Sequence, residues 1–363
     1  MTLPNPLKII DWYIIKKFIG TYIFAILLII AIVVMIDFNE KIDKFIRNGA
    51  PTQAILVDYY LNFIPYFVNL FSPLFVFIAV IFFTSRLADN SEIIAMLSNG
   101  FSFRRLMLPY MISATLIAIM TFSLNSYIIP PANVTRIEFQ NKYVRDKSVT
   151  YSNNIQLEVE PGVIAYFDNF NTNTKTGNRF SLERFEGKEL KSKLTAKQIL
   201  WDTLYHWKIK DYLIRDFVGL KEEITTGTEL DTTLTIIPSD FMISIVDAEQ
   251  MTTPALKTYI DRQKKRGVGN IQLFEIEYHR RFAMTMAAFI LTIIGAAVSA
   301  RKVKGGMGLK IGFGMLLSFA YILFMQVSSS FAVSGFVSSW VAVWIPNFVY
   351  ILIAVWLYRQ APR

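Results

Sequence analysis

The sequence contains no cysteine and only two histidines, His206 and His279. The absence of cysteine excludes disulfides, thiolate metal sites and cysteine nucleophiles. Neither histidine has neighbours at the spacing of metal ligands, so we predict no metal site and no cofactor. The scattered acidic residues Glu158, Glu160 and Asp168 are more typical of solvated strand faces than of a catalytic pair.

Charge is absent from five long stretches, although 18% of all residues are charged. These uncharged stretches are residues 18–36, 59–85, 106–135, 282–300 and 311–358. A helix of about 20 apolar residues spans the hydrocarbon core of a bilayer. The last stretch is long enough for two such helices, with a hairpin around Gly335. The sequence therefore predicts an α-helical membrane protein with six transmembrane helices.

The charges outside these stretches are distributed unevenly. Six spans place both chain ends on one side, together with two connecting pieces. The pieces on that side are residues 1–17, 85–105, 301–310 and 359–363, which carry the whole net charge of +9. Because cytoplasmic loops are rich in Lys and Arg, we expect both termini in the cytoplasm and residues 136–281 outside. Topology thus explains the basic charge, which gives no reason to expect a nucleic acid partner.

The middle of the chain alternates between apolar and polar residues in short runs. These runs are residues 155–159, 162–167, 179–185, 207–212 and 226–237. Short alternating runs without long helices between them are typical of an antiparallel sandwich or barrel. Residues 253–265 then predict an amphipathic helix, with Thr253 as N-cap and Pro254 in its first turn.

Four parts of the chain follow from these patterns. We expect transmembrane helices 1–3 in residues 1–131, a β-rich domain in 132–250, a connecting helix and re-entry in 251–281, and transmembrane helices 4–6 in 282–363.

A polar, amphipathic stretch, residues 85–109, separates the second and third spans. Asn90 and Ser91 are good N-cap residues, and Gly100 is a good terminator. The residues between them that predict one apolar helical face are Ile93, Ile94, Met96 and Leu97. We therefore expect a short helix at about residues 90–100 across the cytoplasmic mouth. Spacing alone does not distinguish a mechanical input from an ordinary helical loop.

Three basic residues, Lys41, Lys44 and Arg47, follow the first span at i, i+3 and i+6. They form either a collar for a phosphorylated lipid headgroup or a solvated helix end. The acidic residues that would balance them are Asp37, Glu40 and Asp43. That balance favours the solvated helix end.

Proline and glycine mark four further places. We expect Pro65 and Pro73 to kink the second span and Pro130 and Pro131 to mark the exit of the third. The pair Gly308 and Gly312, with Gly314, predicts close helix packing, and the Trp344-Ile-Pro-Asn347 run predicts a break in the sixth span.

Taken in order, these features resemble the permease family of lipopolysaccharide export, the LptF/LptG (YjgP/YjgQ) family. The resemblance covers the whole chain and rests on four patterns. They are Glu92 with Leu97, Gly100, Ser102, Arg105, Leu106 and Pro109; Pro130-Pro131-Ala-Asn133; the Trp207 strand with Pro238-Ser-Asp240 and Met251-Thr-Thr-Pro-Ala-Leu; and Arg281, the basic loop and Trp344-Ile-Pro-Asn347.

The resemblance implies a transport subunit of the inner membrane, with a periplasmic, jelly-roll-like insert. Two permease subunits, alike or paralogous, would enclose a cavity for lipopolysaccharide, which the inserts pass to periplasmic bridge proteins. A cytosolic ABC ATPase dimer would drive closure through a coupling helix. The residues implied at that ATPase are Glu92, Leu97, Gly100, Arg104 and Arg105, and those implied at lipid phosphates are Lys41, Lys44 and Arg47.

The chain has no nucleotide-binding loop of its own. Its glycine-rich piece, residues 301–310, has the wrong spacing to Lys310, and Ile311 stands where Ser or Thr is required. Energy would therefore come from a partner.

Other functions compatible with the sequence are a different envelope ABC permease or mechanotransmission subunit, a membrane-anchored envelope enzyme and a passive scaffold. A different envelope ABC permease would be recognised by a cargo other than lipopolysaccharide. An enzyme would need a convergent polar site near one membrane face, and none is evident. The identity of the second subunit, the permease type, the glycolipid and direct lipid binding by the insert stay open.

Overall fold

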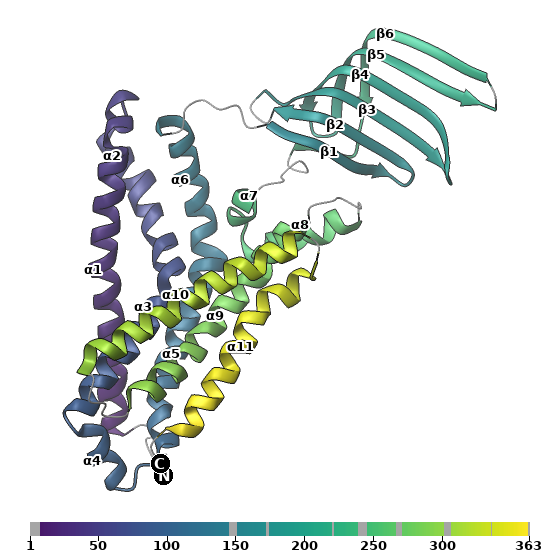
Figure 1. The fold of residues 1–363 in the computed structure, drawn as a ribbon. Helices are drawn as coiled ribbons and strands as arrows, with labels where there is room; N and C mark the ends of the chain where they lie inside the picture. The colour runs from purple at the N-terminus through teal and green to yellow at the C-terminus, as the bar shows by residue number, and fades with distance from the viewer. Residues whose placement is uncertain are drawn as a thin grey trace, which may run out of the picture. The chain divides into compact units, whose positions relative to one another are not determined.

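The structure is a computed structural model that describes residues 8–144, 151–171, 174–219, 221–238, 245–265, 271–300, 306–334 and 336–361 (Figure 1). The chain forms two compact units. We call residues 1–144, 249–253 and 275–363 the membrane unit, and residues 145–248 and 254–274 the β unit.

Among the described residues, six helical columns are long and apolar enough to cross a membrane. They are α1 (Ile9–Arg47); α2 (Thr52–Ala54) with η1 (Ile55–Tyr60) and α3 (Leu61–Asp89); α5 (Phe103–Ser123) with η2 (Leu124–Ile128) and α6 (Ile129–Tyr143); α9 (Gln272–Ser299); α10 (Gly306–Val333); and α11 (Ser339–Gln360). The prediction of six membrane helices is confirmed.

Helix α3 packs against its neighbours at two glycines. A Cβ added at Gly295 of α9 would meet Cγ1 of Val80 at 2.9 Å, and one added at Gly314 of α10 would overlap the end of Ile81. At Gly308 and Gly312 an added Cβ would meet open space. Close packing within the chain therefore uses Gly314, and the Gly308–Gly312 pair does not contribute to it.

The prolines lie within continuous helical columns, with Pro65 and Pro73 inside α3. Pro130 and Pro131 occupy the first turn of α6, directly after the π-helical turn η2, and the column continues through them to Tyr143. The predicted break at Trp344-Ile-Pro-Asn347 is wrong, because α11 is continuous through Pro346. Proline removes the N–H that the Ala342 carbonyl would accept, and the Ser328 hydroxyl of α10 donates to that carbonyl instead.

Asn347 links three membrane helices by side-chain hydrogen bonds. It is fully buried, its Oδ1 accepts from the Tyr321 hydroxyl at 2.8 Å, and its Nδ2 donates to the Ala283 carbonyl at 2.9 Å. We expect Asn347→Ala to lower the unfolding free energy in detergent by about 1–2 kcal/mol, because the Tyr321 hydroxyl loses its acceptor. Thermal unfolding measures this, and Asn39→Ala, at an exposed site, is the control. Equal midpoints for both variants would refute the role of Asn347.

The β unit contains one antiparallel, six-stranded sheet in chain order, inserted between the third and fourth membrane columns. Its strands are β1 (Tyr151–Glu160), β2 (Val163–Asn171), β3 (Thr176–Glu186), β4 (Glu189–Thr203), β5 (His206–Val218) and β6 (Lys221–Thr233). The predicted β-rich insert is confirmed.

One face of this sheet carries the core of the β unit. Trp207 is 1% exposed and packs with Phe167 and Phe170. Its Nε1 donates to the carbonyl of Ile236 at 3.0 Å, so the segment after β6 returns over the sheet. Helices α7 (Ile245–Glu249) and α8 (Thr253–Lys265) follow, and α8 confirms the predicted amphipathic helix.

Candidate coupling and lipid-binding sites

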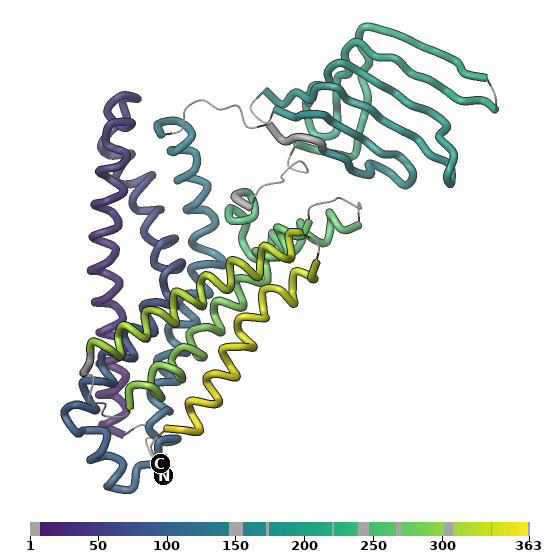
Figure 2. Tube along the Cα trace, viewed as in Figure 1, coloured from purple at the N-terminus to yellow at the C-terminus, as the bar shows by residue number. Residues whose placement is uncertain are grey.

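The short helix predicted at about residues 90–100 is present as α4 (Glu92–Ser98). It lies at the end of the membrane unit where α1 begins and α11 ends (Figure 2). Ile93 is 1% exposed, and Met96 and Leu97 pack with it on the core between α1 and α3. Ile94 was predicted on this face but is 54% exposed, because successive helical residues turn by about 100° and the other three fill the packed side.

The ends of α4 agree only in part with the predicted caps. Ser91 stands at the N-cap in a left-handed conformation (φ 63°), and its side chain makes no capping hydrogen bond. Nδ2 of Asn90 donates to Oε1 of Glu92 at 3.2 Å. Gly100 has φ 83°, and its N–H donates to the Leu97 carbonyl at 3.1 Å. A glycine suits this position because a side chain would be strained there.

The charged residues predicted at the ATPase, Glu92, Arg104 and Arg105, have different surroundings. Glu92 is half-buried, and its Oε2 accepts from the Tyr13 hydroxyl of α1 at 3.3 Å. Arg105 donates from both terminal nitrogens to Asp11, at 2.8 and 2.5 Å. Arg104 is exposed. Of the two predicted arginines, therefore, Arg104 is exposed, whereas Arg105 is partly buried and paired with Asp11.

The three basic residues predicted at lipid phosphates, all on α1, also differ in their surroundings. Lys41 is ion-paired with Asp37, and its Nζ lies 5.0 Å from the ring centre of Tyr59. Lys44 and Arg47 are exposed, and within the described part of the chain neither has an ion pair. The acidic balance expected from the sequence holds for Lys41, whereas Lys44 and Arg47 present their charges outward.

An apolar groove runs beside these residues, between α1 and the column of α2, η1 and α3. The side chains that line it include those of Val34, Met35, Phe38, Ile42, Tyr60 and Leu61. Its lining suits acyl chains, and the exposed charges of Lys44 and Arg47 stand on the same helix.

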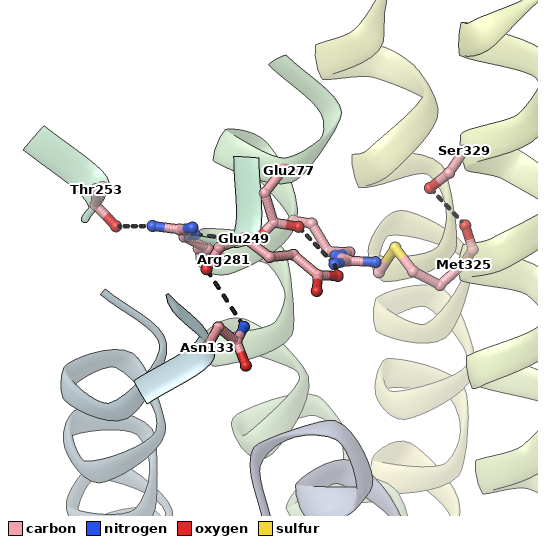
Figure 3. Close-up of polar contacts among 8 residues, drawn as sticks. Asn133, Glu249, Thr253, Glu277, Arg281, Met325 and Ser329 are labelled. Atoms are coloured by element: carbon pink, nitrogen blue, oxygen red, sulfur yellow. Dashed lines mark hydrogen bonds and ion pairs between the residues drawn. The ribbon is translucent and has the colours of Figure 1, made fainter. Parts of the chain in front are cut away.

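A buried ionic cluster, which the sequence analysis did not identify, joins α9 to the segment Glu249–Thr253 (Figure 3). Arg281 is 1% exposed; its Nε donates to Oε1 of Glu277 at 3.0 Å and its Nη1 to Oγ1 of Thr253 at 3.0 Å. Nη2 of Arg280 lies 2.5 Å from Oε2 of Glu277 and 3.3 Å from Oε1 of Glu249. Charged side chains of α9 thus hold the segment Glu249–Thr253, which leads from the β unit back toward the membrane helices, against α9.

Helix α6 adds a further link to this cluster. Nδ2 of Asn133 donates to the Glu249 carbonyl at 3.4 Å (Figure 3). The guanidinium carbon of Arg136 lies 4.4 Å from the ring centre of Tyr66 on α3. Burial, together with the nearby charge of Glu277, raises the pKa of Glu249. The one signal in the sequence was the i, i+3, i+4 spacing of Glu277, Arg280 and Arg281.

Within the described residues, no group of three or more His, Cys, Asp or Glu side chains is placed to hold a metal ion.

Comparison with known families identifies this chain's family. The model described as "Lipopolysaccharide export system permease LptF/LptG" matches residues 12–360, nearly the whole chain. A comparison with curated proteins finds no match.

Proposed function

Because this chain belongs to the LptF/LptG family of lipopolysaccharide export permeases, we propose that it extracts lipopolysaccharide from the inner membrane and passes it to a periplasmic bridge. The match over residues 12–360 carries this proposal, because it includes both the membrane unit and the β unit. The termini are cytoplasmic, and the β unit is periplasmic, in agreement with the positive charge of the cytoplasmic pieces.

A cytosolic ABC ATPase dimer supplies the energy and binds at α4. The packed face of α4 fixes the helix to the membrane unit, while exposed Ile94 and half-buried Glu92 are left for a partner. Gly100 sets the turn that leads to Arg104 and α5. Leu97 packs on the core and positions the helix, so its proposed role in coupling is indirect.

The lipid binds along α1 with a second permease subunit, either a second copy or a paralogue, completing the cavity. The groove between α1 and α3 accepts acyl chains, and Lys44 and Arg47 contact headgroup phosphates. Lys41 acts differently from these two, because Asp37 already neutralises its charge.

Purification from the native membrane in mild detergent, with mass spectrometry of the proteins and lipids retained, tests this function. A small cytosolic ATPase together with lipopolysaccharide is the expected result. An ATPase with another cargo would retain a permease and refute the lipopolysaccharide assignment. A folded sample that retains neither would refute both.

Removing the two exposed charges of α1 is expected to weaken lipid retention. The double variant Lys44→Gln with Arg47→Gln should retain about fivefold less lipopolysaccharide, because each exposed ionic contact contributes about 0.2–1 kcal/mol. Lipid per protein after purification measures it. Lys188→Gln, exposed in the β unit, is the control. Unchanged retention in the double variant would exclude these side chains from the headgroup site.

A further inference from the structure

The first turn of α1 is held to α5 by a buried carboxylate. Asp11 is 2% exposed and accepts three hydrogen bonds: two from Arg105, and one at 2.7 Å from the backbone N–H of Lys8. A bidentate pair between a carboxylate and a guanidinium fixes the relative orientation of the two groups as well as binding them strongly. The start of α1 and the start of α5 are therefore joined by charged hydrogen bonds.

The same part of α1 also contacts both ends of α4. At the first residue of α4 the Tyr13 hydroxyl donates to Glu92. Just past Gly100, the Lys8 Nζ lies 5.1 Å from the ring centre of Phe101. Together with the Asp11–Arg105 pair, these contacts attach the beginning of α1 to the entry, the exit and the continuation of α4.

Between this end and Asp37, which accepts hydrogen bonds from the Tyr59 and Tyr60 hydroxyls of η1, the described side chains of α1 make few polar links to other helices. A narrow strip that includes Phe18 and Tyr22 is buried, and the Tyr22 hydroxyl lies 2.8 Å from Oγ of Ser72 on α3. On the other side Phe24 and Met35 are 67% and 68% exposed. A helix tied at its first turn and packed along one strip can carry a displacement of that turn along its length.

We propose that Asp11 is a positioning residue that makes α1 follow α4. A displacement of α4 reaches α1 through the Asp11–Arg105 pair, without first passing through α3. Arg105 serves in this link rather than as a contact to the ATPase. The inference rests on the proposed function and assigns to it the first step inside the membrane unit.

The test uses the complete complex with its ATPase in proteoliposomes that contain lipopolysaccharide. Asp11→Asn should leave ATP hydrolysis within about twofold of wild type and reduce ATP-dependent lipid release about fivefold or more. Arg105→Gln should do the same, and Arg105→Lys, which keeps the charge but loses the fork, should lie between. Lys16→Gln, an exposed cation on the same turns of α1, is the control.

A distance measurement separates a positioning role from a structural one. Because the chain has no cysteine, spin labels can be placed at Met35 of α1 and Leu352 of α11, both exposed. ATP with vanadate should change their distance in wild type and leave it unchanged in Asp11→Asn. If Asp11→Asn does not assemble, Arg105→Gln gives the same test, because Arg105 is only partly buried.

Wild-type movement and lipid release in both variants would overturn the inference. A wild-type complex that hydrolyses ATP but releases no lipid would instead refute the proposed function, while the label distances would still report whether α1 follows α4.

Discussion

Glu92→Ala is expected to abolish coupling between ATP hydrolysis and lipid release, with a loss of about tenfold or more in transport. Glu92 opens α4 and is only half-buried, and its side-chain contacts are Tyr13 and Asn90, at 3.3 and 3.2 Å. Exposed hydrogen bonds of this kind contribute little to stability, so the variant should fold and insert normally. Lipid release per ATP hydrolysed, in proteoliposomes with the ATPase, is the measurement.

The control for Glu92 lies at the other end of the same helix. Ser98 is exposed, and its hydroxyl donates only to the Ala95 carbonyl of its own helix, so Ser98→Ala should transport as wild type does. Glu92→Gln separates charge from shape and should behave as Glu92→Ala. If Glu92→Ala retained both ATPase binding and transport, the assignment of Glu92 to the coupling site would be wrong.

Features that depend on neighbouring residues were predictable from the sequence. Uncharged runs and strand alternation are local patterns, and the six membrane helices and the β-rich insert follow them. The helical nature of α4 and its termination at Gly100 are local as well. Its packed face was predicted with one residue too many, Ile94, because a seven-residue helix has too few turns to define its buried side from spacing alone.

Features that depend on distant residues were not predictable. Asp11 and Arg105 are 94 positions apart, and nothing in either stretch indicates the other. The continuity of α11 depends on Ser328 of a different helix, which satisfies the carbonyl that Pro346 leaves free. The ion pair of Lys41 was easier to predict from the sequence, because its partner Asp37 lies four residues away on the same helix.

The ionic cluster of α9 was missed because charge was used to mark the end of a span. Residues 282–300 are uncharged, but α9 begins ten residues earlier, at Gln272. Glu277, Arg280 and Arg281 therefore lie inside the helix, where both arginines bind the same glutamate. Charges at the start of a membrane helix can thus be structural as well as topological.

Arg281→Ala is expected to lower the unfolding free energy by about 3–5 kcal/mol. Arg281 is 1% exposed and Glu277 is 2% exposed, so the substitution leaves a buried carboxylate without one of its two cations. It also removes the donor to Oγ1 of Thr253 at the start of α8. Thermal or steric-trap unfolding in detergent measures the loss. Arg86→Ala, exposed at the end of α3, should cost less than about 0.5 kcal/mol.

Thr253→Val distinguishes the two contributions of Arg281. This variant removes one neutral acceptor and leaves the ion pair with Glu277 intact, so we expect a loss of about 1–3 kcal/mol. In the double variant the two losses should fall short of additivity, because Arg281→Ala already removes the Thr253 bond. If the losses of unfolding free energy were fully additive, the Arg281 and Thr253 side chains would act independently of each other. The segment Glu249–Thr253 would then be attached mainly through Arg280 and Asn133.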